Sequence, residues 1–208
     1  ESRQEAVRER HVALMVIHDI DDYCDLVENT MEEWEELDSI NNFILNYVSE
    51  DSVQIADSTL NFFLENIGLC NVWAYNITTQ NIFNSNIEIW QDVSDKNFIV
   101  NTGKCFDLIS SIEKEKEKYY SYNSQAFDSY VTNVEPVLTD ETSLRQDIQR
   151  TIQEADVKLA LYQLSSSLTM YKKHLYLIRK FNERNKKIMN ISDEELRGTF
   201  NYERISTL

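Results

Sequence analysis

The sequence predicts an all-α protein, specifically an elongated bundle of long helices with no sheet. The chain has 208 residues but only 3 Gly and 1 Pro, where average usage would give roughly 15 and 10. Tight β-turns and phosphate-binding loops depend on these two residues, so their scarcity argues against a β-sandwich, a β-barrel and a doubly wound α/β fold. Apolar residues spaced three and four apart indicate helices instead. We expect three long helices and several short ones in a single domain, residues 1–208.

The first helix is predicted over residues 3–37. Its apolar residues alternate at spacings of four and three over three heptads, and they are Ala13, Ile17, Ile20, Cys24, Val27, Met31 and Trp34. This spacing predicts a buried seam, with the acidic residues on the opposite face. Asp38 or Ser39 is expected to cap a second, short helix that ends near residue 49.

Two regions of shorter helices are expected next. Asp51 or Ser52 can cap a helix that runs to residue 67 and stops at Gly68, because glycine adopts the left-handed cap conformation without strain. Between residues 69 and 101 the apolar pattern indicates two short helices, and the Asn-rich segment 81–86 is predicted to be the loop between them.

The second half of the chain predicts two further long helices. One covers residues 104–134 and ends before Pro136, since the residue before proline avoids the α region. The other is capped by Thr139 or Asp140 and runs from about 140 to 189, a length of about 75 Å at 1.5 Å per residue. The apolar seam of this helix comprises Leu144, Ile148, Ile152, Ala155 and Leu159 and then Leu168, Tyr171, Leu175, Ile178 and Phe181. The two parts are out of phase, which predicts a bend or a stutter at residues 165–167. Ser192 is expected to cap one final turn that stops at Gly198.

The negative charge lies in the N-terminal half. Residues 11–95 hold 17 acidic residues and no Lys or Arg, while the formal net charge of the chain is −16. Such a field repels nucleic acid and attracts cationic partners. Two alternatives are a solvated face that keeps the protein soluble and internal neutralisation by the basic segment 172–187, which has seven basic residues and one acidic one. If a partner is bound, the acids away from the seam are the expected contacts: Asp22, Asp25, Glu32, Glu33 and Glu36.

No motif for catalysis, a cofactor or a metal is recognisable. The sequence contains no phosphate-binding Gly-rich loop, no Gly-x-Ser-x-Gly elbow, no Cys-x-x-Cys and no Glu-x-x-His pair. The acidic run from Asp19 to Glu28 fails as a calcium loop because Cys24 stands where an EF-hand needs glycine. We therefore expect a protein that is not an enzyme and needs no cofactor or metal.

The three cysteines bear on the compartment. Cys24 falls on the seam and is expected to be a buried, slowly reacting thiol. Cys70 and Cys105 either form a disulfide, which would imply the secretory route, or remain reduced core thiols. Two glycosylation sequons, Asn76-Ile77-Thr78 and Asn190-Ile191-Ser192, are present at about the frequency that chance gives. The chain begins with Glu, from which we expect either a removed signal peptide or a trimmed chain.

These observations lead to one preferred function and one alternative. The preferred function is a secreted, non-enzymatic binding protein that sequesters a basic protein, a basic peptide or a small cationic ligand through the acidic helical surface. The alternative is a cytoplasmic adaptor or coiled-coil assembly subunit that uses the heptad seams for partner helices. No segment has the 18 consecutive apolar residues of a membrane span, and the oligomeric state is left open.

Overall fold

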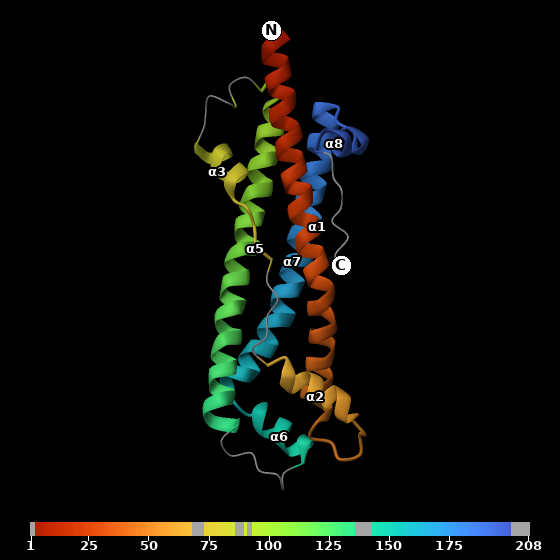
Figure 1. Ribbon diagram of the computed structural model, residues 1–208, viewed down its shortest axis with the longest axis vertical. Helices are drawn as coiled ribbons and strands as arrows, with labels where there is room; N and C mark the ends of the chain where they lie inside the picture. The colour runs from red at the N-terminus through yellow and green to blue at the C-terminus, as the bar shows by residue number, and fades with distance from the viewer. Residues whose placement is uncertain (1–2, 68–72, 86–89, 91–92, 136–142, 201–208) are drawn as a thin grey trace. The chain divides into compact units, whose positions relative to one another are not determined.

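The computed structural model describes residues 3–67, 73–85, 90, 93–135 and 143–200. Among these residues the secondary structure is helical throughout, without a strand, which confirms the all-α prediction. The long helices are α1 (Arg3–Tyr47), α5 (Lys96–Ser129) and α7 (Ala155–Met189) (Figure 1). The short helical segments are α2 (Asp57–Glu65), α3 (Thr78–Ser85), a π-helical segment η1 (Tyr130–Val134), α6 (Leu144–Thr151) and α8 (Asp193–Phe200).

The contacts of the chain group into two compact units. Unit 1 comprises residues 1–26, 74–110 and 174–208, and unit 2 comprises residues 27–73 and 111–173. Each of the three long helices runs from one unit into the other along the chain. The expectation of a single domain over residues 1–208 stays a prediction.

The predicted seam of α1 is buried along its whole length. Ala13, Ile17, Ile20, Cys24 and Val27 are fully buried, and Met31 and Trp34 are 4% and 3% exposed. The seam was readable from the sequence because a spacing of 3.5 residues keeps apolar side chains on one face of a helix. The burial of Cys24 is confirmed with it.

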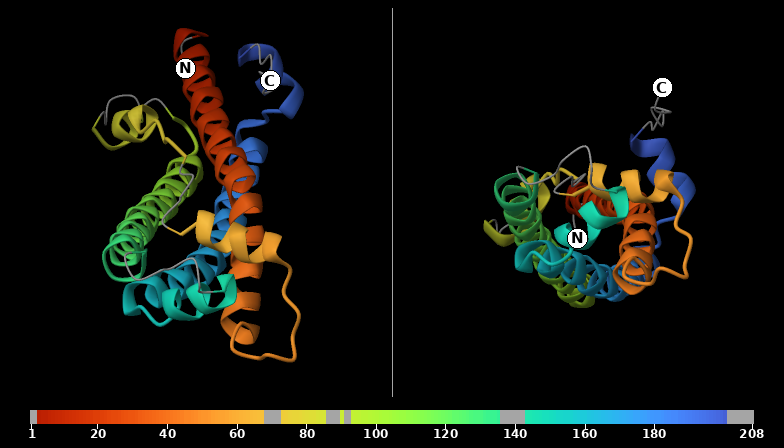
Figure 2. Two further views of the ribbon diagram at one scale, coloured as in Figure 1. Left: turned by 60° about the horizontal axis from the view of Figure 1, so that its bottom comes forward. Right: turned by 90° about the horizontal axis from the view of Figure 1, so that it is seen from below.

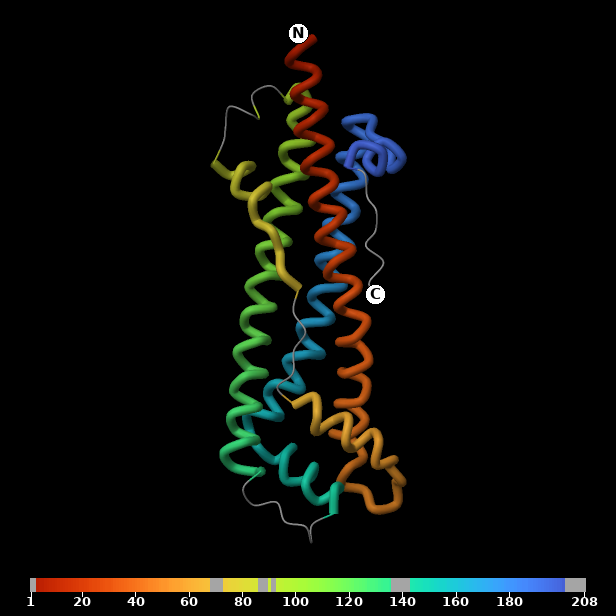
Figure 3. The backbone as a smooth tube through the Cα atoms, in the orientation of Figure 1, coloured from red at the N-terminus to blue at the C-terminus, as the bar shows by residue number. Residues whose placement is uncertain are grey.

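The predicted break at Asp38 or Ser39 is wrong, since α1 continues as one helix to Tyr47 (Figure 3). No glycine or proline interrupts this part of the chain, and a capping residue can also sit inside a helix when its side chain has another partner. Asp38 has one, because its Oδ2 accepts a hydrogen bond from Ser165 Oγ at 3.1 Å within unit 2.

Three other boundaries differ from those expected. The helix expected to begin at Asp51 or Ser52 begins at Asp57 instead. Helix α3 covers residues 78–85, most of the segment predicted to be a loop. Helix α5 begins at Lys96, eight residues before the predicted start, because Asp95 supplies an N-cap: its Oδ1 accepts from the backbone N of Asn97 at 2.8 Å. Gly68, Pro136, Thr139 and Asp140 lie outside the described residues.

The long helix expected over about 140–189 is two helices. Helix α6 starts with a capping box in which Ser143 and Gln146 bond each other's backbone N–H groups, and non-helical residues 152–154 separate it from α7. Helix α7 is continuous across residues 165–167, and the bend or stutter expected there stays a prediction. The break resets the helical phase, so Ala155 and Leu159 are exposed, while Val157, Ala160 and Leu164 are buried in their place.

Unit 1 contains the first half of α1, α3, the start of α5, the end of α7 and α8. Polar side chains join these helices in the interior. Asn182 of α7 donates to Ile17 O and to Asp21 Oδ1 of α1, both at 2.8 Å. Asn185 donates to Thr102 Oγ1 of α5 at 3.1 Å. Because an unpaired amide would be costly in an apolar core, these bonds fix the register of α7 against α1 and α5.

Unit 2 contains the end of α1, α2, the end of α5, η1, α6 and the start of α7. Helices α2 and α6 lie side by side (Figure 2) and close an apolar cluster that consists of Ile44, Val48, Leu60, Phe63, Ile67, Ile148 and Ile152. A second group of rings packs deeper in this unit, where Trp34 lies 4.9 Å from Tyr119 and 5.6 Å from Trp73 between ring centroids. These aromatic side chains are core residues.

Candidate functional site: an acidic pocket between α1 and α8

The five acids assigned to a partner all lie on α1 and are exposed, but the structure places them in different units. Asp22 and Asp25 belong to unit 1, whereas Glu32, Glu33 and Glu36 belong to unit 2. The side chains of Asp22 and Asp25 are 48% and 58% exposed. Asp22 and Asp25 line a pocket of unit 1.

The basic segment 172–187 pairs with the acidic helix, as the internal alternative anticipated. In unit 2, Lys172 Nζ lies 3.0 Å from Glu35 Oε1. In unit 1, Arg179 Nη2 lies 2.7 Å from Asp25 Oδ1, and Lys186 Nζ lies 2.8 Å from Asp21 Oδ2. These cations neutralise part of the charge of α1. Asp25 is therefore less available to a partner than the sequence suggested.

The pocket of unit 1 is a half-open cavity of about 540 Å³ between α1 and α8. Four carboxylates dominate its lining, together with one imidazole, one guanidinium and one leucine side chain. The lining residues are His18, Asp21, Asp22 and Asp25 of α1 and Asp193, Leu196 and Arg197 of α8. A concave surface with several convergent carboxylates attracts a cationic group and can bury part of it.

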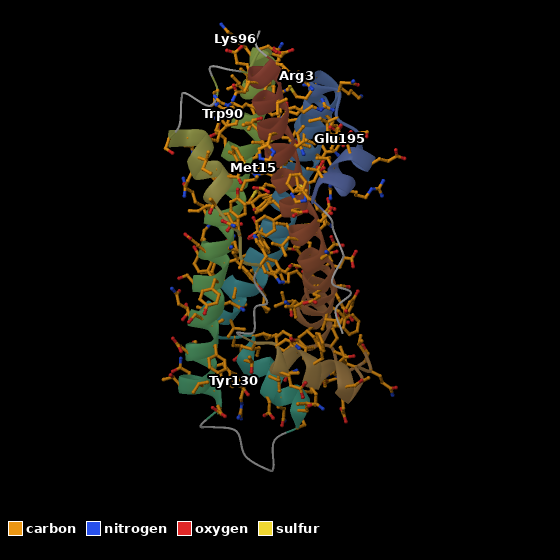
Figure 4. The ribbon with its side chains drawn as sticks, turned by 45° about the horizontal axis from the view of Figure 1, so that its top comes forward. Arg3, Met15, Trp90, Lys96, Tyr130 and Glu195 are labelled. Carbon is orange, nitrogen blue, oxygen red and sulfur yellow. The ribbon has the colours of Figure 1, made fainter. Side chains whose placement is uncertain are left out.

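Helix α8 forms one wall of the pocket because several contacts hold it against α1. Ser192 caps the helix as predicted, with its Oγ accepting from Glu195 N at 3.2 Å, but the helix continues past the predicted stop at Gly198 to Phe200. Arg10 Nε of α1 donates to Glu195 Oε1 at 2.8 Å, its Nη2 contacts Oε2, and its Nη1 donates to Met189 O at 2.8 Å. Figure 4 shows Glu195 on the side of α8 that faces α1. A bidentate guanidinium–carboxylate pair has a defined geometry, so it fixes the orientation of α8 and also attaches α8 to α1.

Lys186 is the structural cation at the edge of this pocket. Its ammonium lies 2.8 Å from Asp21, 2.8 Å from Glu183 and 3.0 Å from Asp193, and its side chain is 11% exposed. Burial alone would lower the pKa of Lys186, but the three carboxylates outweigh it and raise that pKa above 10.5. The same ammonium lowers the pKa of Asp193. Lys186 therefore stays charged and ties α1, α7 and α8 together.

His18 lies in the wall of the pocket and is 8% exposed. Its Nδ1 is 3.4 Å from Asp19 Oδ1 and 3.6 Å from Asp22 Oδ2, and its ring centroid is 4.2 Å from that of Phe200 in α8. Burial lowers the pKa of His18, but the carboxylates of Asp19, Asp22 and Asp21 together raise it above 6.5. Asp19 is itself held by the Thr79 hydroxyl of α3.

The sequence analysis identified Asp22 and Asp25 but missed the other residues of the pocket. His18 and Asp22 are four residues apart on one helix, so their proximity was available from spacing. Asp193, Leu196 and Arg197 are about 170 residues further along the chain, and no local pattern links them to α1. Only the docking of α8 brings them together.

A second cavity, in unit 2, has mixed charge. Its volume is about 560 Å³, and its lining includes Asp51, Asp57 and Arg145. Arg145 Nη2 already donates to Val53 O at 2.7 Å, which fastens the start of α6 to the loop before α2. Because the lining contains both carboxylates and a guanidinium, this cavity favours neither a cationic nor an anionic ligand.

The thiols have no role at the pocket. Cys24 and Cys105 are buried, and Cys105 Sγ lies 3.6 Å from Ile178 O. Burial raises the pKa of Cys105 to about 12. Cys70 lies outside the described residues, so both alternatives for Cys70 and Cys105, a disulfide or two reduced core thiols, stay predictions.

The described residues form neither a metal-binding cluster nor a membrane-spanning helix. No group of three or more His, Cys, Asp or Glu side chains there is arranged to hold a metal ion. Likewise, no described helix is long and apolar enough to cross a membrane. No protein-family model, curated protein sequence or solved structure matches the chain.

Proposed function

We propose that this is a secreted, non-enzymatic binding protein that sequesters a cationic partner, and that the pocket between α1 and α8 is its binding site. The observation that carries the proposal is the convergence of Asp21, Asp22, Asp25 and Asp193 on one cavity. A guanidinium or ammonium group entering it would meet carboxylates on both walls. Charge-assisted hydrogen bonds to carboxylates are about twice as strong as neutral ones.

Asp22 is the carboxylate best placed to receive the partner. Asp21 and Asp193 already share the ammonium of Lys186, and Asp25 faces Arg179. Asp22 faces His18, whose ring is charged only when protonated. The Asp22 side chain is also 48% exposed, so a partner's cation can reach it.

The wider acidic surface has a different role in this proposal. Glu32, Glu33 and Glu36 lie in unit 2, so they do not line the pocket. Exposed charges of one sign raise the association rate of an oppositely charged partner, while contacts in the site set the dissociation rate. We assign these three residues to steering.

The alternative of a cytoplasmic adaptor has less support. It requires the heptad seam of α1 to receive a partner helix, but the seam residues are buried within the chain itself. A partner helix would have to displace that core.

Binding of a short arginine peptide tests the proposal. Acetyl-Arg-Arg-Arg-amide is a suitable probe because guanidinium groups stay charged at all working pH values. We expect saturable binding at pH 8.0 and low salt by calorimetry, weakened about tenfold in the Asp22→Asn/Asp25→Asn variant. The control variant Glu117→Gln/Asp128→Asn removes two exposed acids of unit 2 and should bind within about twofold of wild type. Absence of saturable binding, or equal loss in both variants, would contradict the proposal.

Secretion is tested separately by the mass of the native protein. Asn76 is the better placed of the two sequon residues, because it is exposed and its Oδ1 accepts from Thr78 N at 3.0 Å in an open turn. Asn190 instead adopts φ 50°, and its carbonyl accepts from Arg10. A glycan at Asn76 or a Cys70–Cys105 bond, found under non-reducing conditions, would support the secretory route. Three free thiols without a glycan would favour the cytoplasm.

A further inference from the structure

We infer that helix α8 is a hinged lid on α1 that opens while the rest of unit 1 stays folded, and that Arg10 is the latch that holds it closed. Opening takes Asp193, Leu196 and Arg197 out of the pocket, since these three lining residues lie on α8. The lid follows from the contacts of α8, and only its coupling to a cation rests on the proposed function.

Helix α8 depends on its docking, because it is short and buries little of its own surface. It has 8 residues, and helices shorter than about 12–15 residues are marginal in water. Among these eight residues, all of which the structure describes, one side chain is buried, that of Leu196. In the same unit, α1 and α7 bury Ile17, Ile20 and Ile178 completely. Segments with few buried apolar side chains open at a lower free energy than the core, so α8 should open first.

The connector between α7 and α8, residues 190–192, provides the hinge. Helix α7 ends in a Schellman motif, in which Ile191 N donates to Lys186 O at 2.9 Å and Asn190 N donates to Lys187 O at 3.3 Å. Asn190 adopts φ 50°, in the left-handed region that asparagine enters more readily than most residues. A change of backbone dihedral angles at a few residues between two helices is enough to swing one helix relative to the other.

Arg10 of α1 bonds both sides of this hinge. Its Nη1 donates to Met189 O at 2.8 Å and its Nη2 to Asn190 O at 3.1 Å, at the end of α7. Its Nε donates to Glu195 Oε1 of α8 at 2.8 Å, and its Nη2 also contacts Oε2. Because the guanidinium is planar and its donors are fixed, one side chain specifies the closed position of α8. Arg10 can release Glu195 and still bond the two carbonyls, which precede α8.

Two further contacts favour the closed position. Lys186 Nζ of α7 lies 3.0 Å from Asp193 Oδ1, and the ring of Phe200 lies 4.2 Å from that of His18 between centroids. The side chains of the latch pair are 41% and 32% exposed, so water and salt reach them. Salt screens ion pairs of this kind, and the lid should therefore open more often as the ionic strength rises.

A cation in the pocket should close the lid. The pocket has one wall on α1 and the other on α8. A ligand that touches both walls gains its full set of contacts only when α8 is docked, so it shifts the equilibrium toward the closed state. The latch then acts on the dissociation rate of the ligand, because each opening removes one wall of its site.

Hydrogen exchange of the full chain, followed by mass spectrometry, measures the opening. We expect the amides of residues 196–200 to exchange about tenfold faster in Arg10→Met, while residues 175–185 of α7 exchange at the wild-type rate. Arg8→Met, which removes an exposed arginine of the same helix, should match wild type at both segments. In wild type, raising the salt from about 0.1 M to about 1 M should speed exchange in α8 alone. Equal acceleration of both segments in Arg10→Met, or no acceleration of either, would overturn the inference.

A milder variant keeps the test available if Arg10→Met does not fold. Glu195→Gln removes the charge that Arg10 binds on α8 and leaves the carbonyls at the end of α7 bonded to Arg10. Glu194→Gln makes the same change at the neighbouring, exposed carboxylate and is the control. Exchange of residues 196–200 should be several-fold faster in Glu195→Gln than in Glu194→Gln. Identical rates in the two variants would contradict the role of Arg10 as the latch.

Addition of acetyl-Arg-Arg-Arg-amide distinguishes the lid from the proposed function. At saturating peptide and pH 8.0, we expect residues 196–200 to exchange more slowly than in the free protein. If the peptide does not bind, the proposed function fails, and exchange in the free protein still decides whether α8 is a lid. Binding that leaves the exchange of α8 unchanged would keep the proposed function and overturn the closure of the lid on its ligand.

Discussion

Arg179 Nη2 lies 2.7 Å from Asp25 Oδ1, so the basic segment of α7 reaches one of the acids that the sequence assigned to a partner. The pair is part exposed, at 36% and 58%, and a pair of this kind contributes about 0–1 kcal/mol to stability. It also places a positive charge beside Asp25, which lines the pocket, so we expect its effect on binding to exceed its effect on folding. The competition between internal and external cations is therefore open to test at this position.

Replacing Arg179 by Met should make the pocket a stronger cation site. The variant keeps an apolar stem of similar length but removes the charge that faces Asp25. We expect acetyl-Arg-Arg-Arg-amide to bind several-fold more tightly at pH 8.0, while the free energy of unfolding changes by less than about 1 kcal/mol. Calorimetry and urea denaturation provide the two measurements. Unchanged or weaker binding would show that Asp25 does not contribute to the site.

Charge reversal at Glu32, Glu33 and Glu36 should affect the rate of binding more than the strength of the site. All three side chains are exposed, so replacing them by Lys should leave the melting temperature nearly unchanged. We expect a slower association of the arginine peptide at low salt and a difference that disappears at high salt, because the Debye length falls from about 10 Å at 0.1 M to about 3 Å at 1 M. Stopped-flow kinetics across salt concentrations tests this. If the charge-reversed variant associates at the wild-type rate at low salt, these three acids do not steer the peptide.

Lys186 should contribute to stability, and its contribution should depend on pH. Lys186→Met leaves Asp21, Glu183 and Asp193 facing one another, and we expect a loss of about 1–3 kcal/mol at pH 7, between the values for exposed and for buried pairs. Lys187→Met removes an exposed charge next to it and is the control.

The pH dependence of this loss follows from the direction of the Asp193 shift. Lys186 lowers the pKa of Asp193 below its ordinary value of 3.8, so the stabilisation is present above that value and disappears as pH falls through the folded-state pKa. The difference between wild type and Lys186→Met should therefore shrink below about pH 4 in urea denaturation. A difference that persists in acid would mean that Lys186 acts by packing.

Cys24 and Cys105 should resist thiol reagents in the folded protein. Both are fully buried, and burial raises the pKa of Cys105 to about 12, which leaves very little thiolate at pH 8. We expect both to be modified rapidly only after unfolding in guanidinium chloride, as followed by mass spectrometry of the labelled peptides. Fast labelling of Cys24 in the native state would show that the predicted seam of α1 opens.

The seam of α1 should carry a large share of the stability of unit 1. Ile17 is fully buried, and truncating a buried isoleucine to alanine typically costs about 2–5 kcal/mol. Val7 on the same helix is 63% exposed, so Val7→Ala should change the free energy of unfolding by less than about 0.5 kcal/mol. Urea denaturation of the two variants makes the comparison, and similar values for both would contradict the burial of the seam.

The sequence alone determined the fold class and the buried face of α1. Both follow from local physics: few glycines and prolines exclude turn-rich folds, and a 3.5-residue spacing of apolar side chains places them on one side of a helix. The cap at Ser192 was predictable for the same reason, since it depends on residues within one turn. The boundaries were less accurate, because Asp38 has the chemistry of a helix end but its carboxylate accepts a hydrogen bond from Ser165 in unit 2.

The pocket was decided by tertiary structure. Asp22 and Asp25 could be read as exposed acids, but whether an exposed acid faces solvent, an internal cation or a cavity depends on helices that lie far away along the chain. Asp25 forms an ion pair with Arg179 of α7. Asp21 shares the ammonium of Lys186 with Asp193 of α8. Electrostatic energies depend on distance in space, and in a helical bundle that distance is fixed by the docking of one helix on another, which no local pattern encodes.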